Sequence, residues 1–148
     1  ATNTSGAWRT FVVDSDGDVG KYADLALDSQ GGVHISYFDR ATQAVKYATD
    51  ASGAWEVFTI EAGVGIGMYT AIAVDSTDSV HISYLDGHNQ NLRYATNAGG
   101  AWQVFTIDSG DETGFYTSIA VDSEDYVHIG YLNNSTDDLM YATNRKPD

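Results

Sequence analysis

The chain has 148 residues, of which 43% are hydrophobic and 12% aromatic, a composition that can build a folded core. It contains no cysteine, which excludes a disulfide framework and a thiolate metal site. Its formal net charge is -14 with only 7 Lys and Arg, so it lacks the basic surface that nucleic acids and anionic lipids require. No run of about 18 apolar residues occurs, and no membrane insertion is predicted.

One pattern recurs three times along the chain. Trp8 and Trp55 lie 47 residues apart, and Trp102 follows after the same interval. Two further sets keep this step, namely His34, His81 and His128, and Tyr47, Tyr94 and Tyr141. We therefore divide the chain into repeats at residues 1–47, 48–94 and 95–141, with a short tail at residues 142–148. A period of roughly 40 to 50 residues is typical of four-stranded propeller blades.

Each repeat opens with a predicted strand that carries the tryptophan. In the first repeat this Trp strand is residues 7–13 (AWRTFVV), which are rich in aromatic and β-branched residues. Residues 14–21 form a loop, because their glycines disfavour regular structure. Three antiparallel strands come next. A tight turn of Asp, Ser and Gly joins the strand after Tyr22 to residues 33–37 (VHISY), and the last strand ends in Tyr-Ala-Thr.

The predicted fold is an all-β propeller of three four-stranded blades, with the strand after Tyr22 innermost. The first Trp strand has no strands of its own blade before it, and the last repeat has no Trp strand after it. Three blades are too few for a ring, which typically has about 4 to 8, and an open arc leaves a strand edge unpaired. We therefore expect a six-bladed homodimer, in which each Trp strand completes the partner's last blade as a shared velcro blade. A nine-bladed trimer is the alternative.

The repeats resemble known propeller families. Residues 119–122 (IAVD) followed by residues 127–131 (VHIGY) resemble the core of NHL-type repeats, and the turn from Asp28 to Gly31 is similar to the Asp-box hairpin of sialidase-like propellers. This resemblance covers every repeat and implies a β-propeller. Propeller lectins are the nearest functional analogy, and they imply carbohydrate binding. A sialidase arginine triad cannot be assembled from Arg9, Arg40, Arg93 and Arg145, so sialidase activity is not expected.

The candidate ligand sites lie on the face where the varied, acidic loops gather. Each blade is predicted to place an aromatic ring beside a carboxylate or amide. This pairing suits a neutral sugar, whose C–H groups pack on the ring while its hydroxyls bond to the oxygens. The residues concerned are Tyr22, Tyr69 and Tyr116, with Asp39, Asp86 and Asn133. One weak site per blade gains by multivalency. In the alternative interpretation, the tyrosines only line the central channel.

One loop raises the question of a metal ion. Asp14, Asp16 and Asp18 alternate in a glycine-containing loop, and carboxylates in that pattern can converge on Ca²⁺. The EF-hand pattern is not kept, because no Glu follows at the twelfth position. Ca²⁺ is therefore the one cofactor to consider, and a solvated turn is the alternative.

The repeated histidines suggest a structural role. They stand six residues after an aspartate of the preceding turn, in the pairs Asp28 and His34, Asp75 and His81, and Asp122 and His128. A catalytic site needs one asymmetric cluster near the axis, whereas these residues recur in every repeat. We therefore expect each His to donate to the carboxylate or backbone of that turn. Each repeated Trp is likewise expected to fill the gap between blades.

These features predict a non-enzymatic recognition module that forms a homo-oligomer and binds neutral glycans. Because the chain begins at Ala1, it fits a processed secreted product or a piece of a longer cell-surface protein, and a secreted or cell-surface location is expected. One alternative is an architectural or protein-binding propeller without a small-molecule ligand. Another is a hydrolase or lyase with an axial site, which needs an asymmetric residue such as His88 or Asp16.

Overall fold

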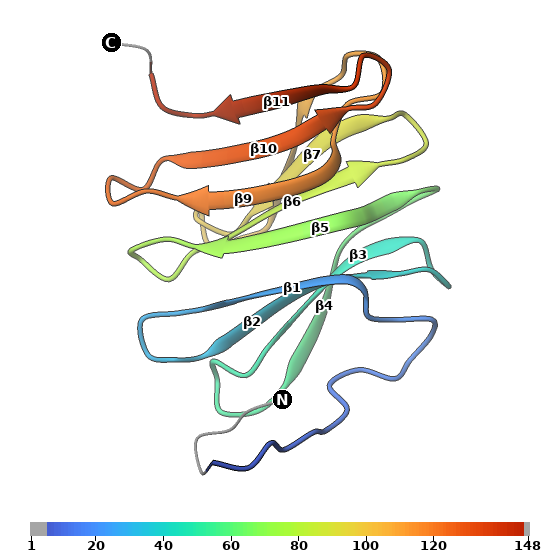
Figure 1. Ribbon diagram of the computed structural model, residues 1–148. Coiled ribbons are helices and arrows are strands. Elements are labelled where there is room, and N and C mark those ends of the chain that lie inside the picture. Colours follow the sequence, from blue (N-terminus) through green and yellow to red (C-terminus); the bar gives the residue numbers. More distant parts are fainter. Residues whose placement is uncertain (1–5, 147–148) are drawn as a thin grey trace.

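A computed structural model describes residues 6–146 of the chain (Figure 1). Residues 1–5, at the start of the first predicted repeat, and residues 147–148, at the end of the tail, lie outside the described residues. The predicted all-β fold is confirmed, since the described residues form eleven strands and no helix. Within residues 6–146, accordingly, no helix is long and apolar enough to cross a membrane.

The strands form three antiparallel sheets that stack on one another (Figure 1). Sheet 1 consists of β1 (Lys21–Leu27), β2 (Val33–Asp39), β3 (Ala44–Thr49) and β4 (Glu56–Ala62). Sheet 2 consists of β5 (Ile66–Val74), β6 (Val80–Asp86), β7 (Asn91–Thr96) and β8 (Gln103–Asp108). Sheet 3 has only β9 (Phe115–Val121), β10 (Val127–Asn133) and β11 (Asp138–Thr143). Strands that follow one another in the chain are neighbours in each sheet, as short connecting turns require.

An aspartate closes the turn between the first two strands of each sheet. In sheet 1, one carboxylate oxygen of Asp28 accepts hydrogen bonds from the backbone N–H groups of Gln30 (2.9 Å) and Gly32 (2.7 Å). The equivalent aspartates of sheets 2 and 3 make the same contacts. Gly31 lies at a φ of 84°, and Asp78 of sheet 2 lies at 63° in the same position. Glycine and aspartate tolerate this left-handed conformation better than most residues, which explains the composition of the turn.

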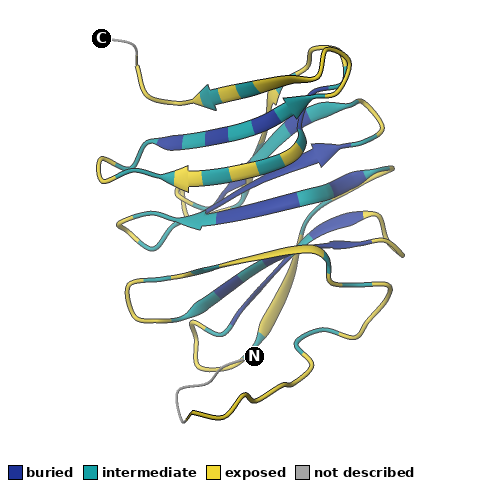
Figure 2. Cartoon of the chain, in the orientation of Figure 1, coloured by how far each residue is buried: buried dark blue, intermediate teal, exposed yellow. Residues whose placement is uncertain are grey.

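The core lies between the sheets, where the middle strands are covered on both faces (Figure 2). Its largest cluster joins Val45 and Tyr47 of β3 to Ile72 of β5 and to Ile82 and Tyr84 of β6. A second cluster joins β7 to sheet 3. β6 is buried along its whole length, because it lies in the central sheet. Burial of this apolar area is the main favourable contribution to folding.

A tryptophan fills the gap between sheets 1 and 2. Trp102, just before β8, packs edge-on against Tyr47 of β3, with ring centroids 5.3 Å apart. It also contacts the main core cluster. This position between two sheets agrees with the role predicted for the repeated tryptophans.

Residues 7–13, predicted to form a strand, do not form one within the single chain. In the structure this segment contains one isolated bridge residue, Arg9, and the Trp8 side chain is 71% exposed. A Trp strand pairs with the last strand of the three that precede it, as β4 pairs with β3. Within residues 6–146 no such strand precedes the segment, so its backbone joins no ladder there. Sheet 3 has three strands, as expected for a last repeat that no Trp strand follows, and a fourth strand from a second copy stays a prediction.

Candidate functional site

The three predicted tyrosines form one row along the inner strands β1, β5 and β9, which run side by side (Figure 1). The ring centroids of Tyr22 and Tyr69 are 4.6 Å apart, and those of Tyr69 and Tyr116 are 4.4 Å apart. The ring planes are tilted by 51° and 47°, within the range that aromatic pairs favour. We call these three residues the tyrosine row. Stacking of the sheets has thus brought together three side chains that are far apart in the sequence.

Each member of the tyrosine row has a left-handed backbone. Their φ angles are 53° at Tyr22, 54° at Tyr69 and 49° at Tyr116. The register between β1 and β2 shifts between Lys21 and Asp24, and the pairs in sheets 2 and 3 shift at the equivalent place. A bulge of this kind inserts one residue into the inner strand and re-aims its side chain. For a bulky L-residue the conformation costs roughly 1–2 kcal/mol.

A shallow groove of about 420 Å³ runs along the tyrosine row. Besides the three rings it is lined by Ala23, Asp24, Thr70, Ala71, Thr117 and Ser118. Tyr22 is 43% exposed and Tyr116 is 63% exposed, and both line the groove. Hydrogen bonding with Tyr116, together with burial, raises the pKa of Tyr69 to about 12. The Tyr69 phenol therefore stays protonated at neutral pH.

The loops predicted to gather on one face do meet there. The backbone N–H of Arg40, in the loop after β2, donates to the carbonyl of Asp18, in the loop before β1, at 3.0 Å. The equivalent loops of sheet 2 are joined by the N–H of Gly87 and the carbonyl of Gly65 (2.9 Å). Sheet 3 repeats this contact between its own two loops. The variable loops thus cover one end of each sheet.

Asp39, Asp86 and Asn133 close the loops in which they lie. The Asp39 carboxylate is fully buried and accepts hydrogen bonds from the N–H of Ala41 (2.9 Å) and the hydroxyl of Thr42 (2.7 Å). Burial alone would raise the pKa of Asp39, but the bonds from Thr42 and Ala41 outweigh it and lower that pKa. Asp86 and Asn133 bond to their own loops in the same way. Direct sugar contacts by these three residues stay a prediction.

Of the predicted calcium ligands, Asp14 and Asp18 face cationic side chains. Asp14 accepts a hydrogen bond from the Lys46 ammonium at 3.3 Å, and Asp18 accepts one from the Lys21 ammonium at 2.7 Å. The N–H of Asp16 donates to Asp14 at 3.0 Å. In the described part of the chain, no three acidic, His or Cys side chains form a group that could hold a metal ion. As arranged here, this loop does not fit Ca²⁺, and calcium binding stays a prediction.

A repeated acid–tyrosine contact was missed by the sequence analysis. In each sheet, a tyrosine hydroxyl of the second strand donates to an acidic residue that precedes this sheet in the chain, each time at 2.6 Å. The pairs are Tyr37 and Asp14, Tyr84 and Glu61, and Tyr131 and Asp108. Burial raises the pKa of Tyr84, and the bond to Glu61 raises it further. Lys46 and Arg93 add ion pairs in sheets 1 and 2. Both partners keep the 47-residue step, and this recurrence was the signal that could have identified them.

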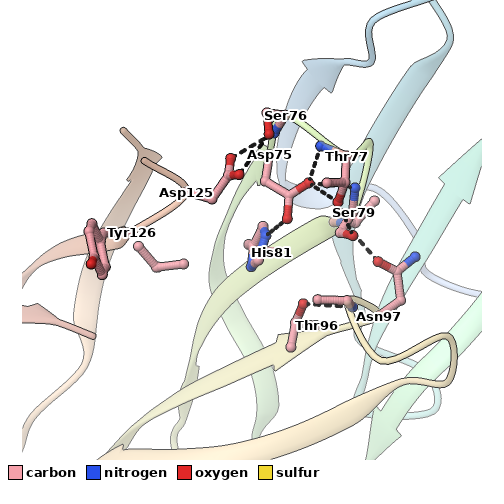
Figure 3. A network of polar contacts seen from close by, with 12 residues as sticks. Asp75, Ser76, Thr77, Ser79, His81, Thr96, Asn97, Asp125 and Tyr126 are labelled. Atoms are coloured by element: carbon pink, nitrogen blue, oxygen red, sulfur yellow. Dashed lines mark hydrogen bonds and ion pairs between the residues drawn. The ribbon is translucent and has the colours of Figure 1, made fainter. Parts of the chain in front are cut away.

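The repeated histidines each bridge an aspartate and a tyrosine, and Figure 3 shows the contact of His81 with Asp75. Nε2 of His81 lies 3.0 Å from a carboxylate oxygen of Asp75, and Nδ1 lies 2.6 Å from the Tyr94 hydroxyl. Since an ionised carboxylate can only accept, Nε2–H donates and Nδ1 accepts from the phenol. His34 and His128 repeat the arrangement. The partner is the aspartate of the preceding turn, as expected.

His88 lies beside a second groove, of about 380 Å³, on the loop face of sheet 2. Glu61 and Arg93 also line this groove. They form an ion pair, and Glu61 also accepts a hydrogen bond from the Tyr84 hydroxyl. Glu61 therefore holds sheet 2 to β4 of sheet 1. An enzymatic site at His88 or Asp16 stays the alternative to the predicted non-enzymatic role.

Neither a family model nor a curated protein matches this chain. The functional proposal therefore depends on the geometry of the tyrosine row and its surroundings.

Proposed function

We propose that this chain is a ligand-recognition β-propeller that binds neutral carbohydrate along the tyrosine row, without catalysis. One observation carries the proposal. At each of the three positions a bulky aromatic residue occupies a left-handed backbone, at φ angles of 49° to 54°, where glycine would be free of strain. Strained backbone of this kind clusters at ligand sites. The strained backbone recurs at all three tyrosines and holds their rings along one exposed groove, which supports a binding role.

The chemistry of the groove favours a neutral sugar over a charged ligand. Exposed phenol rings provide flat apolar surface for sugar C–H groups, and the phenol hydroxyls provide hydrogen bonds at the edge. The carboxylate of Asp24 and the net charge of -14 disfavour anionic ligands such as nucleic acid. Equivalent rings 4.4 to 4.6 Å apart form a continuous platform, which suits several residues of an oligosaccharide.

The proposed propeller is a ring in which the inner strands surround the tyrosine row. Two copies of this chain give six blades, and the row then continues around the channel. A secreted or cell-surface protein would meet glycans in this form. Tyrosine contacts within one copy do not require the second copy, so carbohydrate binding and ring closure can be tested separately.

A protein-binding or architectural role is the second candidate. The observation that favours it is the apolar surface at both ends of the stack, where Leu25 and Leu139 are largely exposed. Large exposed apolar patches mark protein interfaces. This role predicts saturable protein binding and no saturable binding of small sugars.

The test is a glycan screen on immobilised neutral oligosaccharides, followed by titration calorimetry of the best ligand. We expect Tyr69→Ala and Tyr116→Ala to weaken binding by about five- to tenfold, because each stacked ring contributes roughly 1–1.5 kcal/mol. Tyr126→Ala is the matched control, since Tyr126 lies outside the groove and packs under Arg145. Absence of binding to every neutral glycan, or equal loss in all three variants, would overturn the proposal.

A further inference from the structure

The last strand of sheet 3 lacks the cover that its equivalents have (Figure 2). Leu139 of β11 is 88% exposed, whereas Leu92, the same position in β7, is fully buried. Tyr141 is 61% exposed, whereas Tyr47 in β3 is 5% exposed. In sheets 1 and 2 a Trp strand pairs with this strand and the next sheet covers it. β11 therefore presents both an unpaired edge and an apolar face.

The N-terminal segment, residues 8–14, already contacts sheet 1 in the way that the Trp strand β4 contacts sheet 2. Asp14 accepts bonds from Tyr37 and Lys46 of sheet 1, as Glu61 accepts bonds from the equivalent residues of sheet 2. The ring of Phe11 lies 6.0 Å from that of Trp55. The segment is thus docked on sheet 1 through its end, while its backbone joins none of the three sheets that residues 6–146 form.

We propose that a second copy of this chain supplies the missing strand. Residues 9–13 of the second copy pair antiparallel with β11 of the first, and the exchange is mutual, so that two copies close one ring. In sheet 2 the facing pairs are Thr96 and Gln103, Ala95 and Val104, and Tyr94 and Phe105. We transfer this register to the equivalent positions of the other repeats. Thr143, Ala142 and Tyr141 of one copy then lie opposite Arg9, Thr10 and Phe11 of the second copy.

The aromatic contacts fit this register. Tyr47 stacks on Phe58 of β4 at 5.9 Å and meets Trp102 at 5.3 Å. By the same repeat relation, Tyr141 stacks on Phe11 and meets Trp55 of the second copy. The rings of Phe11 and Trp55 already lie together beside sheet 1. One docking event therefore covers the most exposed aromatic residue of β11 with a preformed aromatic surface.

The residues at the new junction are matched to one another. Between sheets 1 and 2 the hydroxyl of Ser36 donates to Thr70 at 3.0 Å, and between sheets 2 and 3 the pair Ser83 and Thr117 repeats this contact at 2.9 Å. At the proposed junction these positions are Gly130 and Ala23 of the second copy. Both hydroxyls are missing together, so closing the junction leaves no buried hydroxyl without a partner.

The charge distribution also favours contact between unlike ends. The first repeat carries four basic residues, Arg9, Lys21, Arg40 and Lys46, whereas residues 95–141 carry none. The proposed junction joins the most acidic repeat of one copy to the least acidic repeat of the other. Joining two like ends would bring equal charges together, which is unfavourable.

The register can be tested by cross-linking, because the chain has no cysteine of its own. We expect Thr10→Cys combined with Ala142→Cys to give a covalent species of twice the chain mass of 15.9 kDa under oxidising conditions. The N-terminal segment and β11 lie at opposite ends of the stack (Figure 1), so a bond within one chain is excluded. Thr10→Cys with Leu139→Cys is the control. It shifts one partner by three residues, about 10 Å, beyond the roughly 7 Å Cα separation that a disulfide allows.

A second test adds an interaction that the junction lacks. Ser29 bonds to Asp78 through its N–H and hydroxyl, both at 2.7 Å, and Ser76 bonds to Asp125 in the same way. At the junction, Ser123 faces Gly31 of the second copy. Gly31→Asp restores the carboxylate, and the position is open, with a φ already suited to it.

The expected effect of Gly31→Asp is a dimer about tenfold tighter, because each ring contains two junctions and charged hydrogen bonds are the stronger kind. Gly100→Asp is the matched control. It adds the same charge at a similarly open left-handed position beside the central sheet, away from both junctions, and should leave the dimer unchanged.

Sedimentation velocity and light scattering report the outcome. A mass of two chains with selective cross-linking of the first cysteine pair supports the proposal. A single-chain mass up to about 1 mM protein would overturn it and leave β11 for another partner. A dimer in which the control pair cross-links equally well would overturn the register, and a mass of three chains would overturn the two-fold closure. None of these results affects glycan binding by the tyrosine row of one copy.

Discussion

Acidification should expose the contribution of the buried Asp75 carboxylate to stability. This side chain is 9% exposed and accepts hydrogen bonds from Nε2 of His81 (3.0 Å), the N–H and hydroxyl of Thr77 (both 2.8 Å) and the N–H of Ser79 (2.9 Å) (Figure 3). Asp75→Asn keeps the shape of the side chain but removes its charge. One of its two terminal atoms then becomes a donor. The substitution therefore tests the charge and not the packing.

The size of the effect follows from the pKa of Asp75. Burial by itself would raise that pKa, but the bonds from His81, Thr77 and Ser79 outweigh it and lower the pKa from 3.8 to about 2. A carboxyl group whose pKa is lower in the folded state stabilises that state at pH values above its pKa in the unfolded chain. This stabilisation is lost as the pH falls through the pKa of the folded state. The window is therefore roughly pH 5 to pH 2. Allowing for screening by nearby solvent, we expect a contribution of about 1–2 kcal/mol at pH 7.

The assay is urea unfolding of the wild type and Asp75→Asn between pH 7 and pH 2.5, followed by far-UV circular dichroism. The variant should be less stable by about 1–2 kcal/mol at pH 7, and the difference should close as the pH falls toward the pKa of Asp75. Asp122→Asn is the control. Asp122 accepts hydrogen bonds from His128 and two backbone N–H groups in sheet 3, without a hydroxyl donor, and is 27% exposed, so we expect a smaller loss there. A difference that is constant with pH would refute the reasoning, as would an equal loss in both variants.

Three further outcomes are expected. Gly67→Ala should destabilise by more than about 2 kcal/mol in chemical denaturation, because its φ is 101° and a Cβ would lie 2.6 Å from the backbone nitrogen of Val45, whereas Gly53→Ala, with open space around it, should cost about 1 kcal/mol. Tyr84→Phe should cost about 1–3 kcal/mol by thermal unfolding, because it leaves Glu61 without the phenol donor; a neutral result would mean that the repeated acid–tyrosine contact is incidental. Millimolar Ca²⁺ followed by excess chelator should leave Tm unchanged, because Asp14 and Asp18 face Lys46 and Lys21; a Ca²⁺-dependent rise would show that the loop rearranges to bind the ion.

Local chemistry was enough to predict most of the fold from the sequence. Alternating apolar residues predicted the strands, and Asp, Ser and Gly between them predicted the turns, because both depend on backbone preferences within a few residues. The step between Trp8, Trp55 and Trp102 predicted that the sheets are equivalent. The partner of His81 followed in the same way, since Asp75 lies six residues before it in the same hairpin.

The tertiary structure decided what depends on contacts between repeats. The spacing of the rings in the tyrosine row arises where one sheet meets the next. The left-handed bulges depend on how the first two strands of each sheet pair, and the bond from Tyr37 to Asp14 joins sheet 1 to the N-terminal segment. Residues 7–13 have the sequence of a strand and yet do not form one, because a strand needs backbone partners that propensity alone cannot supply. Asp39 is occupied by its own loop for a similar reason, since a buried carboxylate requires nearby donors. The sequence by itself thus determined the strands, the turns and their repetition, whereas the stacking of the sheets determined which side chains meet and which backbone edges stay unpaired.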